Sequence, residues 1–476
     1  MAIRVRFAPS PTGFVHLGSL RTALYNYLFA RHNQGKIVLR IEDTDQSRYV
    51  EGAVENLINI LNWAGIDFDE GPHIGGNYGP YHQSERFDLY KKHSDSLLGE
   101  NYAYPCFCSA ERLDQLREQQ KQNEQPVMYD GHCRNITSEE AAERMQTENY
   151  VVRLKTPREG FTIVDDLIRG SVKFENTLID DQVLLKSDGF PTYHLANVVD
   201  DHLMQINHVI RGEEWIPSTP KHVILYKAFG WQLPEFAHLP LLLNPDRSKL
   251  SKRQNDVAVE DYQQKGVLPE ALINFVALLG WNKGDDQELF SKDEMIKAFT
   301  LERVNKSGAV FDLNKLFWMN GHYIRNMNES EYVAAAIRLL SKIGRDKGDK
   351  KTNRTIVLAV RNHIQVFDDL KQATDLFFNE RLDYSEDAIK WIQLDSSKMI
   401  FKNMLDHIEE YSELDINDFK KMMKTVQHAT GIKGKELWMP VRAAMTGLTE
   451  GPELPAVISV FGKHRVKQLL KQALEL

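Results

Sequence analysis

The first 28 residues of the chain predict a short strand, a tight turn and a helix in immediate succession. Alternating apolar residues at positions 3, 5 and 7 indicate the strand, and Gly13 with the two prolines before it indicates an irregular turn. From Leu20 to Leu28, apolar residues recur at helical spacing. The N-terminus of a helix attracts anions, because its backbone N–H groups are unpaired and the helix dipole is positive there. The junction that holds His16 and Gly18 therefore predicts a phosphate-binding turn or, more simply, a capped helix.

Length and composition narrow the class of protein. The 476 residues suffice for about three domains, and no run approaches the roughly 18 apolar residues of a membrane span. The N-terminus lacks the apolar core of a secretory signal. Three cysteines cannot all pair, so we expect a reducing, cytoplasmic environment. A net charge of −8 argues against non-specific coating of nucleic acid, but it permits an RNA partner bound by a local basic patch.

Carboxylates follow directly on the second predicted strand. Residues 37–41 form an apolar run typical of a strand buried on both faces, and residues 42–45 read Glu-Asp-Thr-Asp. In a parallel α/β sheet the carboxyl ends of the strands face the ligand crevice, so these side chains are placed to bind a cationic group. The alternative is an N-cap cluster for the next helix, and both interpretations can hold together. The glycine-rich residues 71–79 lack the Lys-Ser/Thr pair of a P-loop, so a bound nucleotide would be held in another way.

All three cysteines, Cys106, Cys108 and Cys133, lie within one segment. Two thiolates one residue apart with a distant third are a plausible zinc set, but a structural zinc ion needs four ligands. Tyr129 and His132 are the nearest candidates for the fourth. The alternative is three small thiols without a metal, and the spacing does not decide between them.

Residues from about 101 to 190 differ in character from the segments on either side. Alternating runs such as 151–155 and 161–165 predict strands, and residues 109–125 predict a polar, exposed helix. We interpret this segment as a mixed α+β insertion between two halves of an α/β domain. After it, residues 193–211 combine Tyr, His, Asn, Asp and Arg with apolar runs, a density that predicts a polar pocket.

A basic loop follows the second half of this domain. Arg247, Lys249, Lys252 and Arg253 bring four cations into seven residues. Such a cluster attracts polyphosphate. Taken alone, it is better explained as a solvated basic turn.

The last third of the chain has helical periodicity. Apolar residues at 466, 469, 470, 473 and 474 form one face of the final helix, and no convincing period-two pattern occurs after about residue 330. The predicted fold class is therefore α/β, a parallel-sheet domain with an α+β insertion, followed by an all-α C-terminal region.

Two of these motifs together resemble those of a known family. The run His16-Leu-Gly-Ser19 resembles the HIGH motif of class I aminoacyl-tRNA synthetases, and Lys249-Leu-Ser-Lys-Arg253 resembles their KMSKS motif. Residues 7–13, 40–45 and 192–197 are similar to the corresponding segments of the bacterial glutamyl-tRNA synthetases. The resemblance extends essentially from end to end, with the segments in the family's order.

Two positions depart from the family's pattern. Ser19 replaces the second histidine of the HIGH motif, so the contact with phosphate is expected to rest on His16. Relatives that carry zinc have a histidine two residues after the last cysteine, where this chain has Asn135. A related tRNA-modifying enzyme uses a tyrosine four residues before its last cysteine, which corresponds to Tyr129.

The resemblance implies a Rossmann-like catalytic domain whose halves are residues 1–100 and 191–254, the second ending in the KMSKS-like loop. Residues 101–190 would bind the acceptor end of tRNA and hold the candidate zinc site of Cys106, Cys108, Cys133 and Tyr129. Residues 255–325 would contact the tRNA stem, and residues 326–476 would bind the anticodon.

The resemblance also implies a reaction and the residues that serve it. ATP would activate glutamate to glutamyl-adenylate with release of pyrophosphate, and the glutamate would then pass to the 3'-terminal ribose of tRNA(Glu). The expected catalytic residues are His16, Lys249 and Lys252, and ATP would contact these three together with Gly18 and Arg253. Glutamate would be bound by Arg6, Ser10, Glu42, Tyr193, Asn197 and Arg211. Mg²⁺ is expected to arrive with ATP, and the protein is expected to be a cytoplasmic monomer without a membrane partner.

Other functions are open at this point. One is a non-discriminating enzyme that also glutamylates tRNA(Gln). A glutaminyl-tRNA synthetase shares the catalytic core, but its anticodon part is a β-barrel, whereas the last third of this chain has helical periodicity. A zinc-dependent RNA-binding protein without catalysis would leave both phosphate motifs without a role.

Overall fold

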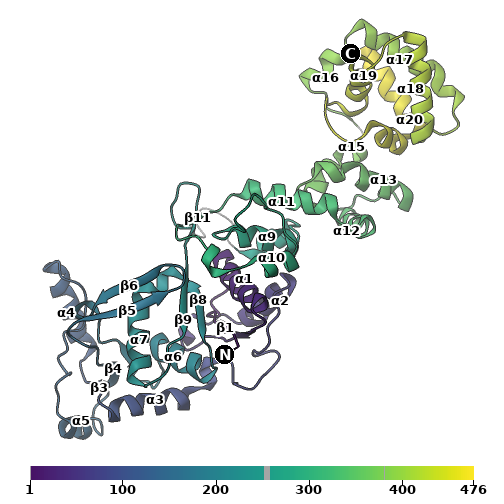
Figure 1. Cartoon of the computed structure of the whole chain (residues 1–476). Helices are drawn as coiled ribbons and strands as arrows, with labels where there is room; N and C mark the ends of the chain where they lie inside the picture. The colour runs from purple at the N-terminus through teal and green to yellow at the C-terminus, as the bar shows by residue number, and fades with distance from the viewer. Residues whose placement is uncertain (1, 251–257, 380) are drawn as a thin grey trace. The chain divides into compact units, whose positions relative to one another are not determined.

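The computed structural model describes residues 2–250, 258–379 and 381–476. It divides into two compact units, one made of Met1–Tyr262 and Leu272–Asp312 and the other of Gln263–Ala271 and Leu313–Leu476. Within the described ranges, every strand belongs to the first unit (Figure 1). None of the described helices is long and apolar enough to cross a membrane.

The strand, turn and helix predicted at the N-terminus are present. Strand β1 (Arg4–Phe7) leads into helix α1 (Leu17–His32), and strand β2 (Lys36–Leu39) returns to pair with β1 in parallel. The two strands are almost wholly buried, as apolar strands of parallel sheets usually are. At Gly35, between α1 and β2, a Cβ atom would lie 2.4 Å from the carbonyl oxygen of Ile3, so only glycine fits this close approach.

A second sheet has four strands, in the order β6 (Gly170–Glu175), β5 (Phe161–Asp166), β9 (Glu235–Leu239) and β8 (His208–Gly212). Strand β9 pairs in parallel with both β8 and β5, whereas β5 and β6 form an antiparallel hairpin. Both β5 and β6 fall within the insertion predicted from the sequence. The structure joins them to β8 and β9 through the pairing of Asp166 with Phe236, a contact between residues far apart in sequence.

The insertion has a small antiparallel sheet of its own, made of β3 (Ala103–Cys106), β4 (Val151–Leu154) and β7 (Val183–Leu185). Its helices are α4 (Ala110–Gln122) and α5 (Ser138–Arg144), and α3 (Phe87–Gly99), which precedes the insertion, packs against β3. No side chain of α4 is buried, which agrees with the polar, exposed helix expected there.

The first unit has further helices outside the insertion. They are α2 (Ala53–Trp63), α6 (Tyr193–Leu203), α7 (Thr219–Ala228) and α10 (Lys292–Ala298). Helices α6 and α7 pack against each other, and α7 also packs against β5 (Figure 1). Near the end of the unit, β10 (Leu242–Leu243) pairs in parallel with β11 (Ala309–Val310). The remaining helices before residue 313 are α8 (Val259–Gln264) and α9 (Pro269–Leu278).

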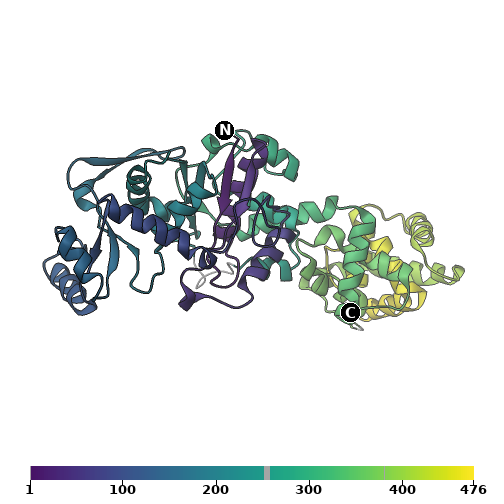
Figure 2. The same cartoon turned by 90° about the horizontal axis from the view of Figure 1, so that it is seen from below.

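The second unit is built from helices, as Figure 2 also shows. They are α11 (Leu313–Asn326), α12 (Glu329–Lys342), α13 (Lys350–Val360), α14 (Leu370–Ala373), α15 (Asp375–Phe378), α16 (Glu386–Ile392), α17 (Asp395–His407), α18 (Ile416–Thr430), α19 (Lys435–Thr446) and α20 (Leu454–Glu475). One continuous apolar core runs through them, from Ile324 to Ala473. The predicted fold class, α/β followed by an all-α region, is confirmed.

Candidate active site

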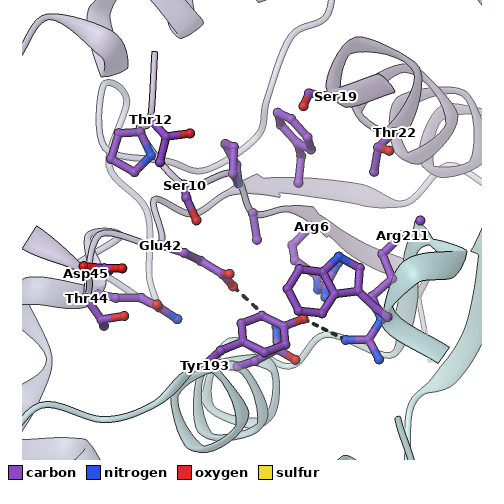
Figure 3. Close-up of a pocket in the computed structure, with 18 of the residues that line it drawn as sticks. Arg6, Ser10, Thr12, Ser19, Thr22, Glu42, Thr44, Asp45, Tyr193 and Arg211 are labelled. Atoms are coloured by element: carbon purple, nitrogen blue, oxygen red, sulfur yellow. Dashed lines mark hydrogen bonds between the residues drawn. The ribbon is translucent and has the colours of Figure 1, made fainter. Parts of the chain in front are cut away.

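A cavity of about 620 Å³ lies where strands β1, β2 and β8 end. Its walls come from the turn after β1, the start of α1, the loop after β2, the start of α6 and the segment after β8 (Figure 3). The carboxyl ends of parallel strands are where open α/β sheets bind ligands. Seven residues predicted from the sequence line this cavity: Arg6, Ser10, Gly18, Glu42, Tyr193, Asn197 and Arg211.

Helix α6 presents one face toward this region. Tyr193 and Asn197 are four residues apart and both line the cavity, and Asp201 follows one turn later on the same face. The Asp201 carboxylate accepts a hydrogen bond from Arg6 Nε at 3.1 Å and another from Arg40 Nη1 at 2.7 Å. Burial alone would raise the pKa of Asp201, but the two guanidinium groups outweigh it and hold this pKa below its usual value.

Glu42 follows strand β2 and places a carboxylate on the cavity wall. Its Oε1 atom accepts hydrogen bonds from Arg40 Nη2 at 3.1 Å and from Asn197 Nδ2 at 3.4 Å. Burial raises the pKa of Glu42 above its usual value, and the positive charges of Arg40 and Arg6 oppose this rise. A cationic group of a ligand would stabilise the ionised form of this carboxylate further.

Arg211, on β8, is another of the arginines that line the cavity. Its Nη1 atom donates to the Tyr193 hydroxyl at 2.9 Å (Figure 3). Its Nη2 atom donates to Thr219 Oγ1 at 2.9 Å. Its Nε atom donates to Nε2 of His238 at 3.1 Å. Three separate elements, α6, α7 and β9, therefore orient one guanidinium group.

The residues expected to contact phosphate are placed differently. His16 is the N-cap of α1, where its Nδ1 atom accepts a hydrogen bond from the backbone N–H of Gly18 at 2.9 Å. His16 and Lys249 do not line the cavity, although Gly18 does. Lys249 is exposed, and its backbone bridges to Leu243. Lys252 and Arg253 lie outside the described residues.

The three predicted cysteines come together, and Tyr129 joins them. The sulfur atoms of Cys106, Cys108 and Cys133 lie within 4.8 Å of one another. The Tyr129 hydroxyl is 3.3 Å from Sγ of Cys106 and 3.4 Å from Sγ of Cys108. His132, the other candidate for a fourth ligand, is exposed and is not part of this group. The hydrogen bond from Cys133, with a further one from Tyr129, lowers the pKa of Cys106 to about 4.

This donor set fits zinc. A thiolate is the form of cysteine that binds metal. The hydrogen bond shared by Cys106 and Cys133 lowers the pKa of Cys106 and raises that of Cys133, so the fit rests on the convergence of the three sulfur atoms. The Tyr129 hydroxyl lies within hydrogen-bond distance of two of the three sulfur atoms, although its pKa is raised by burial and by the neighbouring thiols. The position expected from zinc-binding relatives, Asn135, is exposed.

Sequence reasoning did not single out Arg40, Asp200 and Asp201. Asp200 is fully buried and accepts hydrogen bonds from Arg86 Nε at 2.7 Å, Tyr90 Oη at 2.8 Å and Gln83 Nε2 at 2.8 Å. The helical spacing of Tyr193, Asn197 and Asp201 was the available signal, because residues four apart share a helix face. The long-range partners of Asp200 left no such pattern in the sequence.

Comparison with protein families supplies an independent line of evidence. Residues 2–318 match the family model of the class I tRNA synthetase (E and Q) catalytic domain. Residues 326–474 match the model of an anticodon binding domain. The two matches together cover most of the chain.

Individual relatives agree with these models. A glutamate–tRNA ligase of Alkaliphilus metalliredigens is 48% identical over 488 aligned positions, which cover 100% of this chain and 99% of the relative. One of Clostridioides difficile is 46% identical over 98% of this chain and 97% of the relative. Among solved structures, a glutamate–tRNA ligase of Elizabethkingia meningosepticum in complex with its amino acid has a TM-score of 0.91 at 37% identity, covering 100% of this chain and 99% of that one. The chain therefore belongs to the class I tRNA synthetases of glutamate and glutamine, and within them to the glutamate–tRNA ligase family.

Proposed function

We propose that this chain ligates glutamate to tRNA(Glu) in two steps. ATP first converts glutamate to glutamyl-adenylate with release of pyrophosphate, and the terminal ribose of the tRNA then takes the glutamyl group. The observation that carries this proposal is the cavity at the ends of β1, β2 and β8, where the carboxylate of Glu42 and the guanidinium groups of Arg6 and Arg211 are among the charged groups of the lining. A free amino acid with an acidic side chain has the complementary charges.

Neither step needs a nucleophile from the protein, because the attacking oxygen belongs to a substrate in both. The α-carboxylate of glutamate attacks the α-phosphorus of ATP in the first step, and a ribose hydroxyl attacks the adenylate in the second. Catalysis then consists of positioning the reactants and stabilising the charge that develops on phosphorus. This explains why the cavity is lined by fixed polar groups.

Arg6 and Arg211 would face the carboxylates of glutamate, and Glu42 would face its ammonium group. Both arginines are oriented by buried partners. The printed contacts of Arg6 use only its Nε atom, so its two terminal nitrogens can offer paired N–H donors to a carboxylate, and Arg211 keeps one N–H of Nη2 beside its charge. Ser10, Tyr193 and Asn197 would complete the pocket with neutral hydrogen-bonding groups. Glutamine would offer an amide where the site is built for an anion, and such a mismatch is heavily penalised.

The phosphates of ATP would lie toward the start of α1. The positive end of the helix dipole attracts anions there, and the Nδ1 contact with Gly18 leaves the ring hydrogen of a neutral His16 on Nε2, as a donor. Lys249 and Lys252 would bring positive charge to the leaving pyrophosphate. Mg²⁺ is expected to enter with ATP rather than to occupy a site of its own.

Zinc would be held by Cys106, Cys108, Cys133 and Tyr129. Bound there, it would supply a structural cross-link, with no part in either chemical step. The ion would tie the end of β3 to the loop that carries Tyr129 and Cys133, within the insertion expected to bind the acceptor end of tRNA. A monomeric state and a cytoplasmic location remain expectations of the same proposal.

The exchange of labelled pyrophosphate into ATP tests this function. We expect exchange that depends on glutamate and on added tRNA(Glu), because related enzymes need bound tRNA before they activate glutamate. Glutamine in place of glutamate serves as the control and should support little exchange. An absence of exchange with every tRNA offered would leave only the RNA-binding alternative.

A further inference from the structure

The guanidinium group of Arg211 is held by neutral groups. Its described hydrogen-bond partners are the hydroxyls of Tyr193 and Thr219 and two imidazoles, Nε2 of His238 at 3.1 Å and Nδ1 of His222 at 3.4 Å. No carboxylate of the described chain is among these direct partners. All four side chains are buried or largely buried.

The protonation of both histidines follows from the chemistry of arginine, which donates hydrogen bonds and never accepts them. The nitrogen of each imidazole that faces Arg211 must therefore be the one without hydrogen. In His238 the hydrogen is on Nδ1, which donates to Oδ2 of Asp166 at 2.6 Å. In His222 it is on Nε2, which donates to Nδ1 of His194 at 3.1 Å.

Electrostatics supports the neutral form of both rings. Burial lowers the pKa of His222 well below its usual value, and the charge of Arg211 adds to this effect. Burial also lowers the pKa of His238, with Asp166 opposing and Arg211 reinforcing the shift. The groups that face these rings are Asp166 on β5, Arg211 on β8, Thr219 on α7 and His194 on α6, with Arg6 and Arg169 contributing positive charge.

Arg6 differs from Arg211 in this respect. Its Nε atom is paired directly with the carboxylate of Asp201, which offsets part of its charge. For Arg211, the anion Asp166 is separated from the guanidinium by the ring of His238. A ligand carboxylate therefore meets a charge on Arg211 that no neighbouring carboxylate contacts.

We propose that His238 and His222 are positioning residues of the amino acid site, which act as neutral acceptors that orient Arg211 and leave its charge for a ligand carboxylate. This inference rests on the proposed function, because it deepens the account of how an acidic amino acid is selected. It assigns specificity to two histidines that do not line the cavity. A carboxylate at either position would orient Arg211 equally well but would compete with the substrate.

Pairs of amide substitutions separate this role from simple packing. The terminal amide of Gln falls near the position of Nε2 of histidine, whereas that of Asn falls near Nδ1, and either amide can present its oxygen as an acceptor or its NH2 group as a donor. His238→Gln therefore keeps an acceptor for Arg211, and His238→Asn keeps only the contact with Asp166. At position 222 the order reverses, because there Nδ1 faces Arg211.

We expect the KM for glutamate to rise about 10-fold or more in His238→Asn and His222→Gln, since each loses a hydrogen bond to a charged group. In His238→Gln and His222→Asn it should stay within about threefold of the parent value. The KM for ATP should be unchanged in all four variants. The assay is charging of tRNA(Glu) at saturating ATP and tRNA, with the thermal unfolding midpoint of each variant as the control for folding.

The possible outcomes are distinct. Failure of the parent protein to charge tRNA(Glu) overturns the proposed function itself. If the parent charges but the two amides at one position give the same KM for glutamate, the histidine there is packing only and the inference is wrong. The pair of variants at either position is sufficient for the test. If a variant at one position does not fold, the pair at the other position decides. An equal rise in the KM for ATP and the KM for glutamate in His238→Asn and His222→Gln would also contradict the inference.

Discussion

Asp201 occupies the position where two buried arginines of the active site meet. Its carboxylate pairs with Arg6 and Arg40, and all three side chains are almost fully buried. Pairs of this kind add little net stability when complete, because both charges have lost their hydration. Removal of one partner is costly, since the remaining charge is left buried and uncompensated.

Asp201→Asn should therefore lower the free energy of unfolding by about 3–5 kcal/mol. The matched control is Asp114→Asn, which breaks an exposed pair with Arg117 on α4 and should cost less than about 1 kcal/mol. Denaturant unfolding of the two variants and the parent measures both values. Similar stabilities for the two variants would show that the buried network does not hold the site together.

His194 makes stability depend on pH. Burial, with the positive charges of Lys221 and Arg211, lowers the pKa of this ring from 6.5 to about 3. Between those values the unfolded chain binds a proton that the folded chain does not, so stability is complete above about pH 6.5 and falls as the pH decreases toward 3.

The expected consequence is a loss of about 2 kcal/mol of stability from this residue between pH 7 and pH 5. His194→Gln, which cannot titrate, should lose correspondingly less over the same range. Denaturant midpoints at the two pH values give the comparison. A variant as pH-sensitive as the parent would mean that the pKa of His194 is close to normal in the folded state.

At the scale of elements, individual strands and helices could be predicted from the sequence, but the pairing of strands far apart in the chain could not. Hydrophobic periodicity indicated β1, α1, β2 and the helices of the last third, because each depends on its own residues. The assignment of β5 to the sheet of β8 and β9 depends on a partner about 70 residues away, which no local pattern contains. Residues that line the cavity could be found because they belong to motifs. The supporting contacts of His238, Asp166 and Arg86 could not, because they also join residues far apart in the sequence.

The metal content of the purified protein decides whether the cysteine cluster is a zinc site or three thiols without a metal. We expect about one zinc ion per chain in the purified protein, because three sulfur atoms and a phenol oxygen already converge there. Cys133→Ser should abolish the zinc and lower the unfolding temperature. Elemental analysis of parent and variant measures this directly. A parent protein purified without chelators that holds no zinc would identify the cluster as three thiols sharing hydrogen bonds.

The molecule as a whole combines two compact units with different tasks in the proposed reaction. The first contains the cavity for the amino acid, and the second corresponds to the anticodon binding model. The first unit is expected to decide which amino acid is activated, and the second is expected to decide which tRNA receives it. A complete test must therefore vary both substrates in the intact chain.

The most direct test is the charging of purified tRNA(Glu) and tRNA(Gln) by the intact protein, each with labelled glutamate and labelled glutamine. We predict that the protein forms glutamyl-tRNA(Glu) when glutamate is offered. Charging with glutamine should be at least about 100-fold slower, because the site leaves the charge of Arg211 for a carboxylate. Glutamate on tRNA(Gln) would identify the non-discriminating form and leave the account of the amino acid site intact. Charging with glutamine at a rate similar to that with glutamate would contradict it.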